Sequence, residues 1–397
     1  MAAKLDSAAF LSEPADFSLV LGGPLYQLWL RTHVAGPALD LVARRIVAIT
    51  VVAWVPLLAL TAYEGTALGP AVAVPFFYDI GAQVRFLLAI PLLLVAEVVV
   101  HQRIRPAVRH FVESGLVPAD VLPGFRAALD GALRLRNSVI IEAILLVVVF
   151  GAGGIVWQEL NLTTSTWYAN AATGHLTSAG QWYAHVSIPI FQFLLLRWYF
   201  RLVVWFVLLW RISRLNLRLT PTHPDRAGGL GFLASTAAAF SPVIVAVAAV
   251  LSAQIAERIL FQGQPLEDFK YEIVAFAVLQ GLFVLGPLCV FSPVLLALKR
   301  RGRREYGALA ARYTREFEDK WIGGGAPDGE PLVGSADIQS LADLANSYEV
   351  IREIRGVPFG RDTLVQVAVL ALAPFAPLVL TVVPADEIVK KLLGMVL

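Results

Sequence analysis

Seven runs of apolar residues, each near the length that crosses a lipid bilayer, constrain the fold of this chain more than any other feature. A bilayer core of about 30 Å needs about 20 apolar residues of helix. Charged residues make up only 16% of the 397 residues and hydrophobic residues 57%, whereas soluble domains carry about 25% charged residues. We therefore predict an all-α fold, a polytopic membrane bundle of about seven transmembrane helices. The runs lie at 46–62, 85–101, 139–157, 183–210, 237–256, 272–298 and 363–384.

The distribution of Lys and Arg among the loops predicts the orientation of this bundle. Twenty-five of these residues lie in the N-terminal segment and in the second, fourth and sixth loops, whereas four lie in the remaining loops and the C-terminal tail. Because cytoplasmic loops are enriched in Lys and Arg, we expect a cytoplasmic N-terminus and, with seven crossings, an external C-terminus. If the proline-rich last run only dips into the bilayer and returns, the C-terminus would be cytoplasmic.

The runs and loops divide the chain into four parts. We expect a cytoplasmic N-terminal segment at 1–45, a six-span core at 46–298, a cytoplasmic helical hairpin at 299–362, and a final span with an external tail at 363–397. The stretch 24–34 is amphipathic and begins with a proline suited to a first helical turn, so we expect an interfacial helix there, lying flat on the membrane.

The expected hairpin consists of two amphipathic helices joined by the glycine-rich stretch 323–329, which predicts a flexible linker. Ser335 or Asp337 is a candidate cap for the second helix. The apolar stripes of the two helices can pair with each other, with an extension of the fourth span, or with a neighbouring subunit, which makes a homo-oligomer an expected partner. The stripes are Tyr306, Leu309, Tyr313 and Phe317 on the first helix and Ile338, Leu341, Leu344, Tyr348 and Ile351 on the second.

Proline occurs in six of the seven runs. A proline inside a helix removes one backbone hydrogen bond and tends to bend the axis, and lipid cannot satisfy the freed carbonyl. So many prolines favour bent helices and internal water, although proline is in any case more common in membrane helices than in soluble ones. The prolines are Pro56, Pro91, Pro189, Pro242, Pro287, Pro293, Pro374 and Pro377.

The fourth run carries two charges that a bilayer disfavours strongly. Arg197 and Arg201 lie four residues apart and share one helix face, and each costs about 2.5–3.5 kcal/mol near the middle of a membrane helix. Glu97 and Glu142 lie at a matching depth, each about 9 Å from the inner boundary at about 1.5 Å per residue. We expect a buried cluster of Glu97, Glu142 and Arg201, with Arg197 nearer mid-membrane and without an obvious carboxylate partner.

Two functions follow from this cluster. In the first, the protein is a channel or transporter, with Arg197 attracting a small anion in a water-filled path. In the second, the ion pairs only lock the helices together, and the protein is a non-conducting sensor or scaffold whose hairpin binds a partner.

Other classes of function receive little support. No catalytic motif or metal-ligand spacing is present, so the sequence leans against an enzyme and predicts neither a metal nor a cofactor. The single cysteine, Cys289, excludes an intrachain disulfide, and the net charge of +2 gives no reason to expect nucleic acid as a partner.

The fourth loop contains the string HPDRAGGLGF, residues 223–232. Asp225 can cap a turn, and glycines allow a close approach of the backbone. We expect a tight turn at the cytoplasmic mouth; presentation of its amides to an anion is a weaker alternative, because the lysine and spacing of a phosphate-binding loop are missing. The residues of this mouth loop are His223, Asp225, Arg226, Gly228 and Gly229.

The mouth-loop string and the string SADIQSLADLANSYE, residues 335–349, resemble those of a family of uncharacterised bacterial polytopic inner-membrane proteins. The resemblance mainly covers the C-terminal half of the chain. It implies a location in the bacterial inner membrane and no particular activity.

Overall fold

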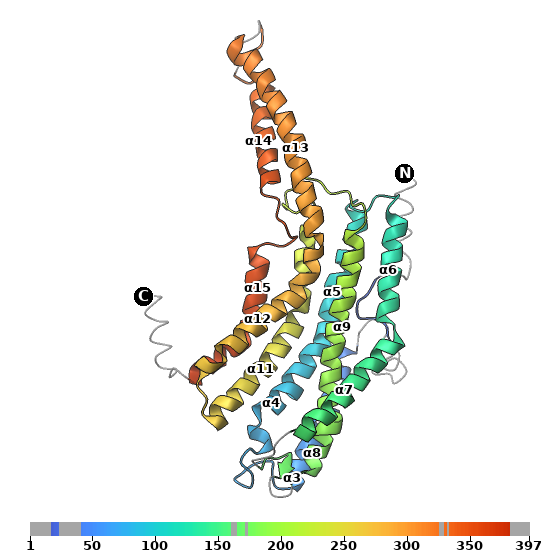
Figure 1. Cartoon of the computed structure of the whole chain (residues 1–397), viewed down its shortest axis with the longest axis vertical. Helices are drawn as coiled ribbons and strands as arrows, with labels where there is room; N and C mark the ends of the chain where they lie inside the picture. The colour runs from blue at the N-terminus through green and yellow to red at the C-terminus, as the bar shows by residue number, and fades with distance from the viewer. Residues whose placement is uncertain are drawn as a thin grey trace.

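A computed structural model describes residues 17–23, 41–159, 165–170, 174–324, 329–331 and 333–381. These residues form a bundle of long helices from which a helical hairpin projects (Figure 1). Apart from one two-stranded sheet, the regular structure is helical, which confirms the predicted all-α class. The predicted interfacial helix at 24–34 lies outside the described residues, as does 325–328 of the predicted linker.

Six helical stretches in the described parts of the chain are long and apolar enough to cross a membrane, and they coincide with six of the seven predicted runs. They support a multi-pass integral membrane protein. The third run, 139–157, coincides with the helix α7 (Val139–Glu159), but its side chains after Gly151 lie outside the description, so the count of seven stays a prediction. The six stretches are Val42–Tyr63, Ile80–Glu113, Ser178–Ser213, Gly231–Gln262, Leu266–Gly323 and Arg361–Leu380.

Most of these stretches are composed of several helical segments. Changes of helix type precede Pro91, Pro189, Pro242 and Pro293, each of which lies in the first turn of the following α-helix, where its missing amide costs least. Prolines lie inside three helices of the spans: Pro56 in α3 (Val42–Tyr63), Pro106 in α5 (Ile90–Glu113) and Pro377 in the 3₁₀-helix η9 (Ala373–Thr381). Two stretches have a π-helix between two α-helices: α4 (Ile80–Gln83), η2 (Val84–Ala89) and α5 (Ile90–Glu113) form the first, and α8 (Ser178–Trp182), η3 (Tyr183–Ser187) and α9 (Ile188–Ser213) form the second. The third consists of the 3₁₀-helix η4 (Gly231–Leu233), α10 (Ala234–Ala237), the 3₁₀-helix η5 (Ala238–Phe240) and α11 (Ser241–Gln262), and the last consists of α15 (Arg361–Leu372) and the 3₁₀-helix η9 (Ala373–Thr381). The longest consists of the 3₁₀-helix η6 (Leu266–Phe269), α12 (Lys270–Leu285), the 3₁₀-helix η7 (Gly286–Phe291), α13 (Ser292–Phe317) and the π-helix η8 (Glu318–Gly323).

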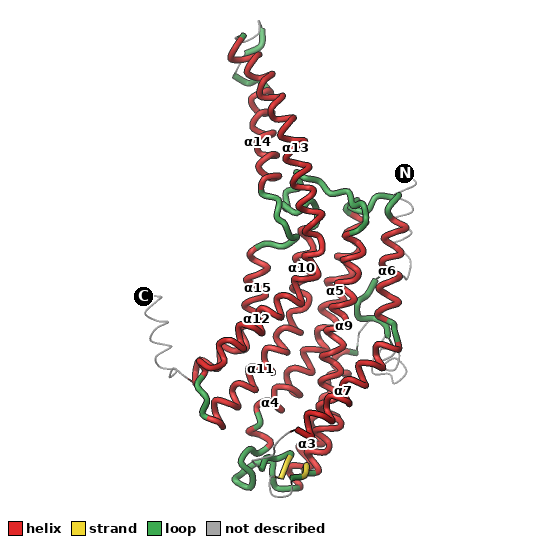
Figure 2. The backbone as a smooth tube through the Cα atoms, in the orientation of Figure 1, coloured by secondary structure: helices red, strands yellow, loops and turns green. Residues whose placement is uncertain are grey.

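The connections between the spans gather at two ends of the bundle (Figure 2). At one end, which we call the hairpin end, α13 continues out of the bundle and pairs with α14 (Ala336–Arg352). At the opposite end lie the short 3₁₀-helix η1 (Phe76–Tyr78) and the antiparallel strands β1 (Ala169–Asn170) and β2 (His175–Leu176). The amphipathic helix α6 (Leu122–Arg136) packs along α9 toward the hairpin end.

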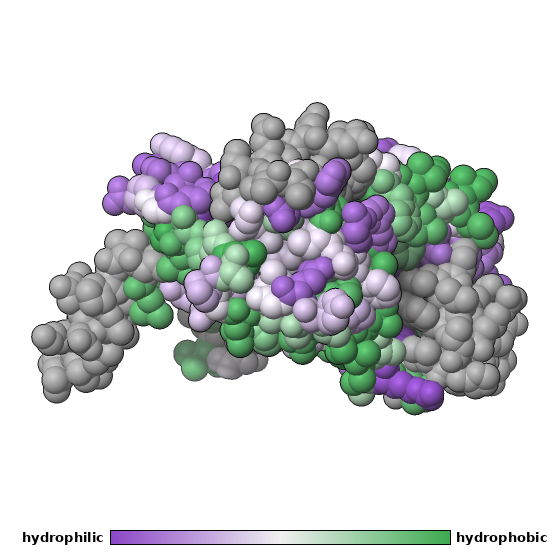
Figure 3. Space-filling model, turned by 90° about the horizontal axis from the view of Figure 1, so that it is seen from below, coloured by the Kyte–Doolittle hydropathy of each residue, from purple (hydrophilic) through white to green (hydrophobic). Residues whose placement is uncertain are grey.

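The outer faces of the spans are apolar. Exposed valine and leucine side chains recur every fourth position, which places them on one face of each helix. Seen from the opposite end, hydrophilic and weakly hydrophobic residues occupy the middle of the visible surface, and hydrophobic residues lie around it (Figure 3). An apolar surface of this kind favours a lipid environment. Its members include Val47, Val51 and Val55 on α3 and Val274, Val278 and Leu282 on α12.

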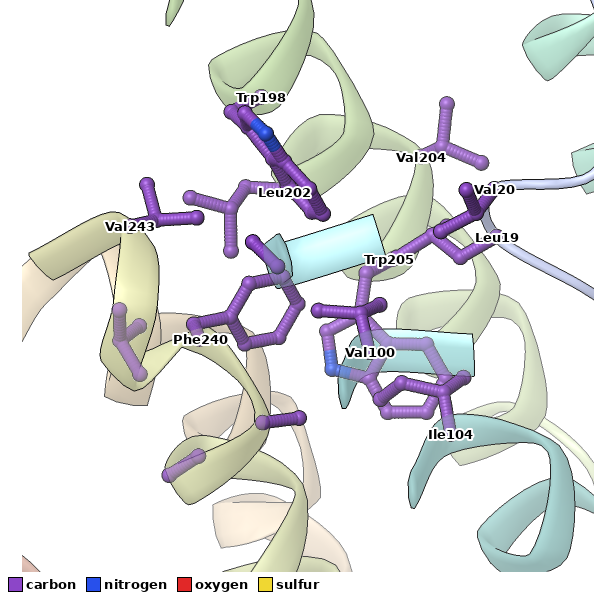
Figure 4. Packing of buried hydrophobic residues seen from close by; sticks show 14 of the residues in the cluster. Leu19, Val20, Val100, Ile104, Trp198, Leu202, Val204, Trp205, Phe240 and Val243 are labelled. Atoms are coloured by element: carbon purple, nitrogen blue, oxygen red, sulfur yellow. The ribbon is translucent and has the colours of Figure 1, made fainter. Parts of the chain in front are cut away.

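The core between the helices is rich in aromatic side chains of α9. Trp198 and Trp205 are almost completely buried, and the Trp198 indole Nε1 donates a hydrogen bond of 2.9 Å to the Leu93 carbonyl of α5. Phe240 of η5 and Val100 of α5 belong to the same cluster (Figure 4). Trp198 lies between the two arginines of α9 and Trp205 lies one turn after Arg201, so this packing holds α9 against α5 next to both arginines.

The two hairpin helices pack on each other, as the first of the three expected arrangements requires, but Leu309 and Ile338 of their apolar stripes remain exposed. The Tyr313 hydroxyl donates to the Asp337 carbonyl at 3.1 Å, and Lys320 contacts the Asp337 carboxylate at 2.8 Å. The Ser335 hydroxyl accepts a hydrogen bond from the Asp337 amide at 3.1 Å, which confirms Ser335 as the N-cap of α14.

Candidate functional site

Among the described residues, five charged side chains from four helices meet inside the bundle. They come from α3 (Arg45), α5 (Glu97), α7 (Glu142) and α9 (Arg197 and Arg201), and none is more than 7% exposed. Three guanidinium groups and two carboxylates carry a formal charge of +1. Buried charges of this kind are stable only when they are paired and hydrogen-bonded. We call this group the charge cluster.

Glu97 is the centre of the charge cluster. Its Oε2 accepts a hydrogen bond from Arg45 Nη1 at 2.6 Å, and its Oε1 accepts one from Arg201 Nη2 at 2.7 Å. Arg197 Nη1 lies 3.7 Å from the same Oε1. One carboxylate thus joins α3, α5 and α9. The guanidinium carbon of Arg201 also lies 4.5 Å from the Trp198 ring centroid, which adds a cation–π contact.

Arg197 differs from the expectation that it would have no carboxylate partner. Its Nε lies 3.5 Å from Glu142 Oε1, in addition to the 3.7 Å contact with Glu97. The expectation placed Arg197 nearer mid-membrane and paired Glu142 with Arg201 on depth alone. In the structure Glu142 pairs with Arg197 instead, because α7 lies against the face of α9 from which Arg197 projects. Both of these contacts are nonetheless about 1 Å longer than the two short bonds of Glu97.

Arg45 is the member of the charge cluster that the sequence analysis missed. The first apolar run begins at Ile46, so Arg45 was placed in the N-terminal segment with the other basic residues. The structure begins α3 at Val42, which puts Arg45 in the first turn with 0% exposure. The sequence did contain a signal for the burial of Arg45. This residue directly precedes the apolar run and shares a helix face with Ile49 and Ala53.

A short segment, residues 17–23, lies against the charge cluster between α6 and α9 (Figure 1), and we call it the strap. Arg197 Nη2 donates to the Gly22 carbonyl at 3.4 Å, and Arg136, the last residue of α6, donates to the Ser18 carbonyl. Burial and the nearby charge of Arg201 lower the pKa of Arg136 to about 10. The strap thus contacts Arg197 of α9 and Arg136 of α6.

The mouth loop folds around the carboxylate of Asp225. Asp225 Oδ1 accepts hydrogen bonds from the Ala227 amide at 2.8 Å and the Gly229 amide at 3.2 Å, and Oδ2 accepts one from the Gly231 amide at 2.7 Å. Partial burial acts to raise the pKa of Asp225, but these amides and His223 outweigh it and hold the pKa below its ordinary value. The amides considered for an external anion therefore bind the loop's own carboxylate.

The remaining mouth-loop residues also have structural contacts. His223 Nδ1 lies 2.8 Å from Asp225 Oδ1, and Arg226 forms an ion pair of 3.0 Å with Glu353, just after α14. Gly228 has a φ of +66° and Gly229 a φ of +100°, backbone conformations that favour glycine. The tight turn was predicted correctly, and its contact with the end of α14 was not predicted.

A second polar group, at the opposite end, was not predicted. Asp79 caps α4 by accepting the Ala82 amide at 2.6 Å, and it accepts a hydrogen bond from Trp167 Nε1 at 2.8 Å. Glu257 of α11 accepts the Gly81 amide at 2.7 Å. Both carboxylates thus hold the start of the long second span, next to a cavity of about 350 Å³. This group was not predicted because Asp79 and Glu257 lie far apart in the sequence.

Comparison with protein families, curated proteins and solved structures finds no match for this chain. The resemblance to bacterial inner-membrane proteins therefore stays a prediction. Among the described residues, no three His, Cys, Asp or Glu side chains are grouped so that they could hold a metal ion.

Proposed function

We propose that this protein is a channel or transporter that carries a small anion across the membrane, and that Arg197 is the anion contact. The observation that carries the proposal is the imbalance of the charge cluster, in which, within the described part of the chain, three buried arginines face two buried glutamates. A cationic site that a bilayer strongly disfavours is typical of a substrate or ion pathway.

The geometry distinguishes Arg197 from the other arginines. Arg45 and Arg201 hold Glu97 at 2.6 and 2.7 Å, distances of strong charge-assisted hydrogen bonds. Arg197 contacts its carboxylates at 3.5 and 3.7 Å, so a passing anion can replace those contacts at a smaller energetic cost. Arg136, whose pKa is lowered mainly by burial and also by the charge of Arg201, is a further cation beside the charge cluster.

Anion flux into proteoliposomes tests this proposal, with chloride and phosphate as the probes. We expect flux with the wild-type protein and a loss of at least about tenfold with Arg197→Leu, because a buried charge pair contributes more than about 1.4 kcal/mol. Arg197→Lys should retain part of the flux, since it keeps the charge. Arg258→Leu is the matched control, because Arg258 is half-exposed near the opposite end of α11 and should leave flux unchanged.

Wild-type flux that persists in Arg197→Leu would remove the role of Arg197. Absence of flux for both probes, with a folded protein, would contradict the proposal and favour the second candidate. That candidate is a non-conducting sensor or scaffold. It is favoured by α13, which runs without interruption from the bundle into the projecting hairpin (Figure 1).

Replacement of residues 306–350 by a short Gly-Ser linker separates these two functions. Transport through the bundle predicts that this variant still conducts, because the charge cluster lies outside the deleted part. A scaffold predicts no flux in either protein and loss of partner binding in the variant.

The proposal includes a homo-oligomer in a bacterial inner membrane with the hairpin end in the cytoplasm. The basic loops at the hairpin end and the resemblance of the two strings support the location and the orientation, and the exposed Leu309 and Ile338 of the hairpin stripes support the oligomer. Reporter fusions after residue 330 and after residue 175 should report opposite sides of the membrane. Light scattering of the purified protein should give a mass above the 43.1 kDa of one chain.

A further inference from the structure

We propose that the strap, residues 17–23, covers the charge cluster on the side of the hairpin end and gives access to it by moving away from α5, α6 and α9. This inference rests on the proposed transport function, since it assigns the regulation of the same site. It is carried by three observations: the backbone contacts of the strap, its burial, and two glycines that allow its close approach.

The backbone of the strap contacts the arginines around the charge cluster. The Gly22 carbonyl accepts from Arg197, the proposed anion contact, and the Ser18 carbonyl accepts from Arg136 of α6. The Ser18 hydroxyl also lies 2.9 Å from Nδ1 of His101, one turn beyond Glu97 on α5. The strap thus joins α5, α6 and α9 through polar groups that an anion could replace.

The strap is buried as deeply as the core itself. Phe17, Leu19 and Val20 are no more than 3% exposed, and Leu19 and Val20 belong to the cluster of α5 and α9 side chains that surrounds Trp205 (Figure 4). Three apolar side chains of the strap are therefore packed into the core, while two of its carbonyls accept hydrogen bonds from guanidinium groups. This combination of apolar packing and polar contact is what a closing segment requires.

Gly22 and Gly23 allow the strap to approach the charge cluster. Their φ angles are +147° and +89°, which favour glycine. A Cβ atom at Gly23 would lie 2.8 Å from Glu142 Oε1, and one at Gly22 would meet the guanidinium of Arg136. An alanine at either position should therefore destabilise the observed position of the strap, because its Cβ disfavours the backbone conformation and lies too close to a neighbouring side chain.

Cysteine accessibility tests the strap without relying on transport. In a Cys289→Ser background, Val20→Cys is treated with a membrane-impermeant maleimide, and the labelling rate is compared with and without Gly23→Ala. We expect slow labelling in the parent and labelling about tenfold faster with Gly23→Ala, because alanine disfavours this backbone conformation. Chloride flux into proteoliposomes should rise in the same variant.

Two controls accompany this measurement. Gly115→Ala, which also places alanine at a positive φ of +73° but has nothing within 4 Å of its Cβ, should leave labelling of Val20→Cys unchanged. A cysteine at Val284 of α12, which is 1% exposed, should stay unlabelled with Gly23→Ala and thereby show that the bundle remains folded.

The outcomes distinguish the strap from the proposed function. Fast labelling of Val20→Cys in the parent, or a rate that Gly23→Ala does not change, overturns the strap even if the wild type conducts. Faster labelling with no flux in any variant supports the movable strap and overturns transport. If Gly23→Ala labels faster but its flux equals that of the wild type, the strap does not close the access to the charge cluster.

Discussion

Replacing Glu97 with glutamine perturbs the charge cluster at its centre. The substitution keeps the size of the side chain but removes the negative charge that faces Arg45, Arg201 and Arg197 at 2.6, 2.7 and 3.7 Å. The formal charge of the cluster rises from +1 to +2. With Glu97 only 2% exposed, water cannot compensate for the lost charge.

The expected loss of stability follows from these contacts. Removal of one partner from a buried ion pair costs about 3–5 kcal/mol. The glutamine carbonyl can still accept one of the two short hydrogen bonds, so we expect a loss near the lower limit, about 3 kcal/mol. Glu142→Gln is the matched control, because its contact with Arg197 is 3.5 Å long and should cost about 1 kcal/mol.

The variants are ranked by their thermal unfolding in detergent. Each protein is heated, and the loss of its monodisperse peak is measured by size-exclusion chromatography. The double variant Glu97→Gln, Glu142→Gln should be the least stable of the three. Arg45→Met combined with Glu97→Gln should recover part of the loss, because it restores the formal charge to +1. If Glu97→Gln is as stable as the wild type, or no less stable than Glu142→Gln, the ion pairs do not stabilise the bundle and this reasoning fails.

Three further predictions concern the hairpin end. Gly228→Ala should lower the melting temperature by several degrees, because its Cβ would overlap the Leu298 side chain at a φ of +66°, whereas Gly263→Ala, at a similar φ of +67° but in open space, should lower it less; equal shifts would exclude the overlap as the cause. The lowered pKa of Asp225 predicts a contribution to stability that is fully present above its unfolded pKa of about 3.9 and is lost as the pH falls through the lower folded pKa. In a melting series from pH 7 to pH 2.5, the wild type should therefore lose more stability than Asp225→Asn, and equal losses would contradict this contribution. Ser335→Ala should destabilise the hairpin by about 1 kcal/mol through loss of the N-cap, measurable as faster proteolysis of α14, and an unchanged rate would mean that the cap contributes nothing.

The membrane spans were predictable because they depend on a property of the sequence itself. A stretch such as 237–256 is apolar on all sides, and its length alone determines that a helix there can cross a bilayer. The ends of the spans were less predictable. The second apolar run ends near His101, but α5 continues to Glu113, because Ile104, Val108 and Phe111 are buried by contacts with other helices.

The charged residues of the candidate site were likewise predictable in part, whereas their pairing was not. Spacing and depth along the chain identified Glu97, Glu142, Arg197 and Arg201 as charges that need partners, because the energetic penalty for a charge in lipid depends on depth alone. Which arginine contacts which carboxylate depends on how each helix is rotated, and no local pattern encodes that rotation.

Only the tertiary structure therefore paired Arg197 with Glu142, brought Arg45 to Glu97, and laid the strap on the charge cluster. The hydropathy of the chain determined by itself that helices cross the membrane and where the charged exceptions lie. The packing of those helices decided how the exceptions are neutralised, since contacts between residues 52 to 175 positions apart exist only once the bundle has formed.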